Sequence, residues 1–334
     1  MAIKNFGTFS RYFTQESVAD IVSNLPKPTT PLMDLLFPAN RRVQKASPFV
    51  SVADIQGVTG AVPLVRRDGR SVPIDPTKST NMLVEVDPIK VSRFLSGKDV
   101  NDLISLGQAQ TIKATVDENI GYLRDRVSET TEVLCRQALT GKIAYPYATE
   151  NGQGGVCEIE LGKPQTLTAA TLKTTSTLAE IQGLFEKALT EYQAKVGSAG
   201  KPVFMLGATV YNNLITALSA LNGGFNAYAK WTDTGLVLLG RYEIMSMALT
   251  FVLPGSSTVS NVVADNQIKI IDLANPGKLF YAALDDLDAN LAPLPFFAKT
   301  WEEKDPSGVK IVGESKPLPA IAMSRVAVIT VTVK

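Results

Sequence analysis

The sequence contains no histidine. This absence excludes the Ser-His-Asp and Cys-His arrangements of nucleophilic catalysis, and it excludes every zinc site that uses imidazole ligands. Carboxylate and lysine chemistries are what remain open to an enzyme built from these 334 residues. The composition therefore weighs against a catalytic role before any motif is considered.

Cysteine is almost as scarce, since Cys135 and Cys157 are the only two. Their separation matches no CxxC redox or metal motif, and a small core residue is the simplest role for Cys135. Such sparse cysteine fits a reducing compartment. The first residues lack the charged-then-apolar pattern of a signal peptide, and no apolar run reaches the roughly 18 residues of a membrane span. We expect a cytoplasmic chain that contacts no membrane.

The chain also lacks a marked excess of either charge. Lys and Arg number 33 and Asp and Glu 32, which leaves a net charge of +1. This balance creates no global field for nucleic acid or for a membrane surface. Hydrophobic residues make up 45% of the chain, a globular composition, and the length suggests about two domains of roughly 150 residues each.

Proline is concentrated in the first 48 residues, around one short apolar stretch that runs from Leu32 to Phe37. Proline at this density prevents long helices and keeps the chain extended. We predict an N-terminal arm over residues 1–48. Its apolar stretch, which includes Leu35 and Phe37, cannot form a core alone and must dock on the body of the protein or on a neighbouring subunit.

Residues 49–95 alternate between apolar and polar side chains and contain a strong turn signal at Asp68-Gly69. Prolines within the alternating runs bar these strands from the middle of a sheet. We predict a long exposed hairpin whose edges invite pairing with another chain. Its turn carries Arg66, Arg67, Asp68 and Arg70, which could meet nucleic acid or form ion pairs with a neighbouring subunit. We favour the subunit.

Residues 99–139 have the clearest helical pattern, with Asp99 as a candidate cap and Gly141 as a terminator. Apolar residues recur at steps of three and four along one face. A helix of about 40 residues would be about 60 Å long. The apolar positions are Val100, Leu103, Ile104, Ile112, Val116, Ile120, Leu123, Val127, Leu134 and Ala138.

A loop-rich stretch at 141–176 precedes a compact α/β unit. Helices are predicted at 178–196 and from 208 or 209 to 218, with a buried strand at 203–206 between them. Further strands are predicted at 244–251, 268–273 and 321–333. In the last strand Val326, Val328, Thr330 and Thr332 share one face, and Ala327, Ile329 and Val331 share the other.

Four short motifs could carry chemistry, and each has a simpler structural interpretation. Residues 152–155 and 197–202 resemble fragments of nucleotide-binding loops, but their glycine spacing is wrong. The acidic residues Asp285, Asp286 and Asp288 could hold a hard cation, although a solvated turn is simpler. Residues 302–305 offer paired carboxylates, which adjacent strand positions would point apart. Trp231 and Trp301 are predicted to be core or interface anchors. No catalytic residue, metal or cofactor is predicted.

Two stretches resemble the lambda-type major capsid family of tailed phages, the capsid E family. The first is Pro63-Leu64-Val65-Arg66-Arg67-Asp68-Gly69-Arg70, continuing through Val84-Glu85-Val86-Asp87-Pro88 to Ser96-Gly97-Lys98-Asp99-Val100. The second is Trp301-Glu302-Glu303-Lys304-Asp305-Pro306, followed by Glu314-Ser315-Lys316-Pro317-Leu318-Pro319. The order of elements resembles the family over nearly the whole chain.

The resemblance implies an α+β chain with the Hong Kong 97-type phage capsid fold. Its parts would be an N-terminal arm at 1–48, an extended loop at 49–95, and a peripheral domain at 96–164 and 286–334 with the spine helix at 99–139. The axial domain would be 165–285. A family-like arm directly after Met1 also suggests that no long scaffolding segment is fused to the chain.

The implied function is that of a major capsid protein in the icosahedral head of a tailed phage, located in the virion and assembled in the host cytoplasm. Its partners would be copies of itself in hexamers and pentamers, a scaffold, a portal, double-stranded DNA without sequence specificity and, in some relatives, a decoration protein. Two alternatives stay open: an encapsulin-like nanocompartment subunit, and a carboxylate-based hydrolase. The residues expected to contact a neighbouring subunit are Leu35, Phe37, Arg66, Arg67, Asp68, Arg70 and Trp301.

Overall fold

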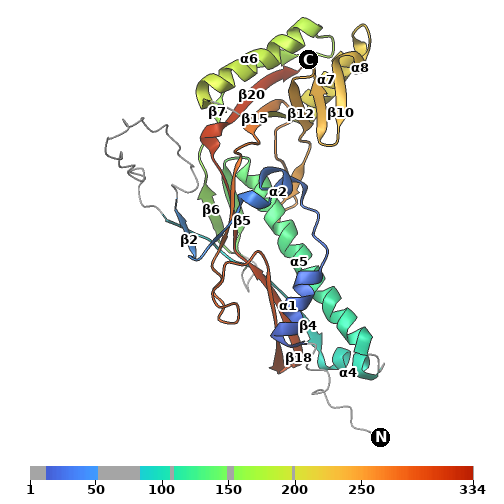
Figure 1. Cartoon of the computed structure of the whole chain (residues 1–334), viewed down its shortest axis with the longest axis vertical. Coiled ribbons are helices and arrows are strands. Elements are labelled where there is room, and N and C mark those ends of the chain that lie inside the picture. The colour runs from blue at the N-terminus through green and yellow to red at the C-terminus, as the bar shows by residue number, and fades with distance from the viewer. Residues whose placement is uncertain (1–12, 52–82, 106–108, 149–153, 198–199, 334) are drawn as a thin grey trace, which may run out of the picture.

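The structure, a computed structural model, describes residues 13–51, 83–105, 109–148, 154–197 and 200–333. The molecule is elongated, with a large sheet at one end and a smaller sheet at the other (Figure 1). Between them runs the helix α5 (Ala109–Ala138). The shorter helix α4 (Gly97–Ser105) precedes it, so the predicted helix at 99–139 is present as two helical segments. Gly141, at φ 96°, follows the last turn as predicted.

The start of α4 differs from the prediction in one respect. Asp99 lies in the first turn of the helix, and Ser96 precedes the helix. The Ser96 hydroxyl accepts a hydrogen bond from the Asp99 N–H at 3.2 Å, and the Asp99 carboxylate accepts one from the Ser96 N–H at 3.0 Å. This reciprocal arrangement is a capping box, in which two otherwise unpaired donors are satisfied.

The predicted N-terminal arm contains short helices where an extended chain was expected. Thr14 caps α1 (Gln15–Asn24) by accepting a hydrogen bond from the Ser17 N–H. Prolines then separate α1 from α2 (Pro31–Leu36), a short helix of six residues with Pro31 at its first position. The arm continues through η3 (Ala39–Arg41) into β1 (Arg42–Lys45), and β2 (Phe49–Ser51) begins the predicted extended loop. Proline therefore limits helix length here without keeping the whole arm extended.

The large sheet has eight strands, in the order β10-β11-β12-β9-β15-β20-β7, with β8 beside β20. One face packs against α6 (Leu178–Val196) and α7 (Ala208–Ala220), whose apolar residues share one buried cluster with the strands. Figure 1 shows α6 lying along this sheet. The strands are β7 (Gln165–Thr166), β8 (Ala170–Leu172), β9 (Pro202–Leu206), β10 (Ala229–Thr232), β11 (Gly235–Leu238), β12 (Tyr242–Ser246), β15 (Gln267–Asp272) and β20 (Val326–Val333).

Helix α6 has the predicted boundaries, and β9, α7 and β15 are present within a few residues of theirs. The predicted strand at 244–251 is divided between β12 and β13 (Thr250–Val252), which pairs with β14 (Val259–Asn261). The predicted strand at 321–333 is likewise divided. Its first residue ends β19 (Pro317–Ile321), the 3-10 helix η4 (Met323–Arg325) follows, and the rest forms β20.

The smaller sheet has the order β17-β18-β4, in which β17 (Phe297–Lys304) and β18 (Ser307–Ser315) form a long hairpin beside β4 (Ile89–Ser96). One face of this sheet packs against α1 and α5 through Leu95, Ala298 and Ile311. Three further small sheets contribute to the body. One has three strands in the order β1-β16-β19, where β16 is Gly277–Ala282. The other two each have two strands: β2 with β3 (Leu83–Glu85), and β5 (Lys142–Pro146) with β6 (Val156–Glu160). The helix α8 (Phe225–Tyr228) lies before β10.

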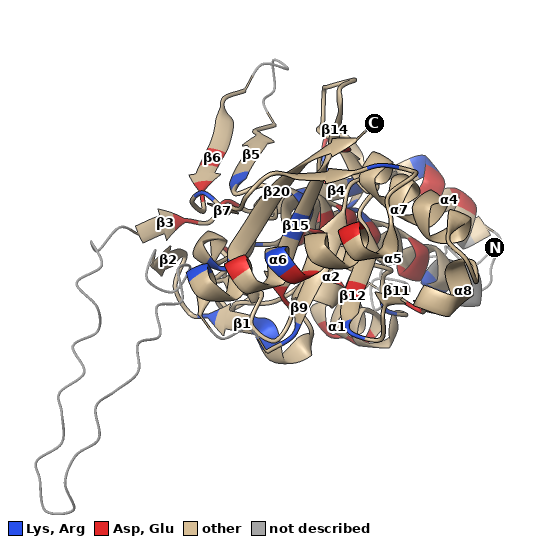
Figure 2. Ribbon diagram, turned by 90° about the horizontal axis from the view of Figure 1, so that it is seen from above, with Lys and Arg blue, Asp and Glu red and all other residues tan. Residues whose placement is uncertain are grey.

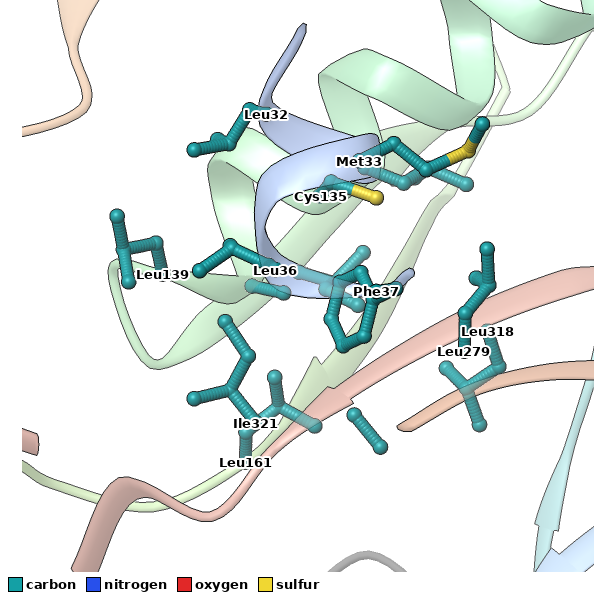
Figure 3. Packing of buried hydrophobic residues seen from close by; sticks show 14 of the residues in the cluster. Leu32, Met33, Leu36, Phe37, Cys135, Leu139, Leu161, Leu279, Leu318 and Ile321 are labelled. Atoms are coloured by element: carbon teal, nitrogen blue, oxygen red, sulfur yellow. The ribbon is translucent and has the colours of Figure 1, made fainter. Parts of the chain in front are cut away.

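A central core lies between the two ends, where α2, α5, β16 and β19 meet. Figure 3 shows Leu32, Leu36 and Phe37 of the arm pointing into the same cluster as Cys135, Leu279 and Ile321. Helix α5 contributes to this core with Leu134 and Ala138, and to the smaller-sheet core with Val116 and Ile120. One helix therefore joins the cores of both halves of the molecule.

Candidate assembly surfaces

The residues predicted to contact a neighbouring subunit have different fates in the single chain. Arg66, Arg67, Asp68 and Arg70 lie outside the described residues. Phe37 has no exposed surface, because it is buried in the central core of its own chain. Leu35 is partly buried against that core, and Trp301 is 39% exposed on β17. The apolar stretch of the arm therefore docks on the body of its own chain, and contacts with another copy stay a prediction.

Glu132 of α5 fastens the arm to the body. Its carboxylate is buried and accepts hydrogen bonds from the Leu32 N–H at 3.1 Å and the Met33 N–H at 2.8 Å. These N–H groups lie in the first turn of α2, where backbone N–H groups have no partner within the helix. Arg136, one turn further along α5, lies 3.4 Å from the same carboxylate and supplies the opposite charge. A buried anion is thereby matched to a helix start and a cation.

Trp301 lies on the outward face of the smaller sheet. In the strand register it stands beside Lys310 of β18, which stands beside Phe94 of β4, so the three side chains share one face. The ammonium groups of Lys299 and Lys310 lie 5.7 and 5.5 Å from the centre of the Trp301 ring. Such a cation–π arrangement holds the indole in place while leaving part of it exposed.

Phe94 owes its position to a glycine. A Cβ at Gly308 would lie 2.4 Å from Cζ of the Phe94 ring and 2.3 Å from the Leu95 carbonyl oxygen. The ring therefore occupies the space that any other side chain would need. Trp301 and Phe94 together give this face an exposed aromatic pair, and aromatic residues are enriched at protein interfaces.

The three aspartates near position 286 form ion pairs. Asp286 and Asp288 lie 2.7 and 2.8 Å from the Lys299 ammonium. Asp285 is paired with Lys316. The ammonium of Lys299 lowers the pKa of Asp286, against the opposing effect of burial. Within the part of the chain that the structure describes, no group of acidic or thiol side chains is arranged to hold a metal ion.

The loop-like motifs also find partners within the chain. The Gly200 and Lys201 N–H groups donate to the Asp272 carboxylate at 3.1 and 2.8 Å, so those donors are occupied. In residues 302–305, Glu303 pairs with Lys310 at 3.4 Å, in agreement with the structural interpretation. Residues 152 and 153 lie outside the described residues.

The base of the predicted extended loop is tied to the hairpin of β5 and β6. Asp87 accepts a hydrogen bond from the Tyr147 hydroxyl at 2.7 Å, and this contact raises the pKa of Tyr147. Burial and the Asp87 carboxylate raise the pKa of Cys157 to about 11, so its thiol stays protonated and weakly nucleophilic at neutral pH. An apolar pocket of about 250 Å³ lies beside these residues and Leu318.

Charges are dispersed over the surface. Figure 2 shows Lys and Arg interspersed with Asp and Glu on the helices and strands. This agrees with the net charge of +1 and with the expectation of no global field. Among the described residues, no helix combines the length and the apolar character that crossing a membrane requires.

Sequence reasoning passed over Glu132, Lys269 and Leu287. Glu132 and Lys269 are buried charges, and their burial follows from contacts more than 90 residues apart in the chain, which no local pattern reveals. Leu287 is 82% exposed inside an acidic run. A leucine flanked by two aspartates was a signal in the sequence that could have indicated a contact surface. Its neighbours in the chain leave most of its apolar side chain exposed.

Comparison with known proteins adds a family match over almost the whole chain. The family model described as phage major capsid protein E matches residues 14–332. The solved structure of the capsid protein assigned to a prophage of E. coli CFT073 is similar, with a TM-score of 0.59 and 16% identity over 96% of this chain and 99% of that chain. At this identity the likeness shows a shared fold.

Two further solved structures are more distantly similar. A cyanophage A-1(L) capsid chain has a TM-score of 0.45 and 13% identity, over 90% of this chain and 92% of that one. The virus-like particle from Pyrococcus furiosus has a TM-score of 0.40 and 10% identity, over 95% of this chain and 99% of that one. Among curated proteins, none matches the chain.

Proposed function

The chain belongs to the phage major capsid protein E family, and from this premise we propose that its copies assemble as hexamers and pentamers into the icosahedral head of a tailed phage. As a member of that family it is a structural protein of the capsid shell, with the Hong Kong 97-type fold that the sequence predicted. The observation that carries the proposal is the family match over residues 14–332. The encapsulin-like alternative is not favoured by that match.

Several surface features support association between copies. Large apolar side chains are exposed on separate parts of the molecule, among them Leu83 within the predicted extended loop, Trp231 at one edge of the large sheet, Trp301 on the smaller sheet and Leu287 on a loop. Apolar side chains gain free energy when a partner covers them. Many copies with modest contacts form a closed shell by mass action, because every copy uses its contacts at once.

The proposed partners beyond the chain itself are a scaffold, a portal, packaged double-stranded DNA and a decoration protein. The near-neutral charge suits a shell around DNA, since a strongly basic inner wall would bind phosphates and hinder packing. Assembly in the host cytoplasm and residence in the virion belong to the same proposal. The role is structural, and no reaction is assigned to any residue.

The four-part division stays a proposal with one adjustment. The sequence placed residues 326–333 with the peripheral domain, but β20 is hydrogen-bonded between β15 and the strands β7 and β8 of the large sheet. We therefore assign β20 to the axial domain. The arm, extended loop and spine helix keep their predicted assignments.

The first experiment is negative-stain electron microscopy of the purified protein, alone and with its scaffold. We expect closed icosahedral shells, or tubes and capsomer rings when conditions are incomplete. Nuclease-protected DNA inside shells from infected cells would support a phage head, whereas enclosed protein would support a nanocompartment. A compact monomer under every condition would contradict the proposal.

A further inference from the structure

Leu287 is the most exposed large apolar residue that the structure describes, at 82% of its full surface. It lies between β16 and β17, in a loop that also exposes Leu291. An isolated exposed leucine on a flexible loop would need no explanation. This loop, however, is held in one conformation by its own contacts, so the exposure of Leu287 is a fixed feature of the surface.

Hydrogen bonds, a buried apolar cluster and ion pairs fix the loop. The Asn290 N–H donates to the Leu287 carbonyl at 3.0 Å and the Leu291 N–H to the Asp286 carbonyl at 3.1 Å. Asn290 and Leu291 both adopt the left-handed region, at φ 52° and 54°, which non-glycine residues occupy at a cost. Beneath them Leu284, Ala289 and Phe297 form a small buried cluster.

Lys299 holds the loop from below by pairing with both Asp286 and Asp288. The leucine is thus presented on a rigid support, which reduces the ordering cost of binding.

The outward charge around Leu287 is acidic. The carboxylates of Asp285 and Asp288 are 64% and 62% exposed, while their partners Lys316 and Lys299 are 3% and 22% exposed. The lysines therefore lie beneath the loop and the carboxylates face solvent. A partner surface for this loop should offer an apolar hollow with positive charge at its rim.

The same chain carries a hollow of that kind on the side of α5. It has a volume of about 510 Å³ and lies between α5, β4 and the β13 strand end, with Val133, Tyr145 and Leu253 among its apolar lining residues. At its rim Tyr122 is exposed, with the guanidinium groups of Arg93 and Arg126 at 5.4 and 5.1 Å from the ring centre.

The rim carries two positive charges, Arg93 and Arg126, and one negative charge, Glu129, which pairs with Arg126. It therefore has an excess of positive charge.

We propose that the loop around Leu287 of one copy docks into this hollow of a neighbouring copy, with Asp285 and Asp288 facing Arg93 and Arg126. The inference rests on the proposed shell and names one contact within it. The two surfaces differ, so the contact is heterologous and continues from copy to copy, which is how rings form when the rotation closes. Leucine supplies the buried apolar area, and the charges fix orientation.

The test is disulfide trapping in assembled shells. A double variant, Leu287→Cys with Val252→Cys, places one thiol on the loop and one on an exposed residue that lines the hollow. Under mild oxidation we expect a ladder of covalent multimers beyond the dimer on a denaturing gel. All variants carry Cys157→Ser, because Cys157 is a partly exposed free thiol while Cys135 is buried, so each single variant can give at most dimers. Leu287→Cys with Lys230→Cys, an exposed position on β10, is the matched control and should give no ladder.

A second measurement does not depend on the thiols. Leu287→Ser should raise the protein concentration needed for assembly about tenfold, because the apolar burial is lost. Val156→Ser, at another exposed apolar position, should leave it unchanged. If wild-type protein forms shells but the double variant gives no ladder, the inference is overturned and the proposed function stands. The same holds if Leu287→Ser assembles as wild type does. A wild-type protein that forms no shells would instead overturn the proposed function.

Discussion

At the scale of single residues, buried charges hold together segments that are distant in the chain. Glu132 receives two N–H groups from the start of α2, about 100 positions earlier in the sequence. Lys269 is buried in β15 and donates to the carbonyl oxygens of Leu139, just after α5, and Val262, just after β14. Each charge acts at an element end, where backbone groups lack partners in their own helix or strand.

Replacing Glu132 with glutamine should destabilise the protein. One acceptor oxygen would become an N–H₂ group facing a backbone N–H, and the charge that balances Arg136 would be lost. We expect the free energy of unfolding to fall by about 2–3 kcal/mol, measured by urea denaturation of the unassembled protein. Glu129→Gln, one turn earlier and exposed, is the matched control and should change it by less than about 0.5 kcal/mol. Equal effects of the two variants would contradict the prediction.

Lys269 should give the protein a measurable pH dependence. Burial lowers the pKa of Lys269 to about 8, below its ordinary value of 10.5. Between about pH 8 and 10.5 the unfolded chain therefore binds more protons than the folded one, so this residue makes stability rise with pH. From pH 7.5 to 9.5 we expect wild type to gain about 2 kcal/mol relative to Lys269→Met.

Urea midpoints across that pH range measure the difference. Lys230→Met, at an exposed position, should run parallel to wild type and serves as the control. Parallel curves for wild type and Lys269→Met would show that the buried ammonium does not titrate as its surroundings indicate.

At the scale of elements, the arm is part of the core of its own chain. Phe37 is fully buried among residues of α5, β16 and β19 (Figure 3). Leu35, two positions earlier, is only partly buried. Phe37→Ala should therefore lower the free energy of unfolding of the unassembled protein by about 3–5 kcal/mol. Leu35→Ala should cost clearly less. If Phe37→Ala left the isolated chain unaffected and impaired only assembly, the arm would instead be held by a neighbouring subunit.

The sequence predicted the helices better than the strands, for a physical reason. Helix α6 is amphipathic over 19 residues and has a local capping box between Thr177 and Glu180, so local pattern specifies both its existence and its start. The strands β16 and β18 were not predicted as elements, and of β17 only the residues from Glu302 onward were treated as strand positions. Their ladders join residues far apart, such as Gly277 with Ile321, and short apolar runs do not reveal such partners.

At the scale of the whole molecule, contacts between copies should separate from stability within a copy. Trp301 is 39% exposed and lies outside the buried clusters, so Trp301→Ala should change the unfolding free energy by less than about 1 kcal/mol. We expect it to reduce shell yield, measured by light scattering and electron microscopy, because the aromatic face it shares with Phe94 would be truncated. Thr232→Ala, exposed on β10, controls for an arbitrary surface truncation. Normal yield from Trp301→Ala would remove Trp301 from the predicted contacts.

The family and the fold class were predictable because the order of elements resembles that of the family over nearly the whole chain, and the family model matches residues 14–332. The contact residues were less so. Trp301 lies on an exposed face, yet Phe37, chosen for the same apolar character, is buried within its own chain. Apolar character alone does not distinguish an interface from a core. The distinction depends on whether distant segments such as α5 and β16 already cover the side chain.

Helix α5 has a mechanical consequence. Thirty residues of continuous helix span about 45 Å, contain no proline, and are anchored by Ile120 in one core and Leu134 in another. A continuous helix that is packed into a core at two places resists bending far better than a flexible linker does. In the proposed shell, outward pressure from packaged DNA should leave each subunit's length along α5 unchanged, and the strain should appear at the contacts between subunits. The elasticity of the particle would then be determined by the interfaces between its subunits.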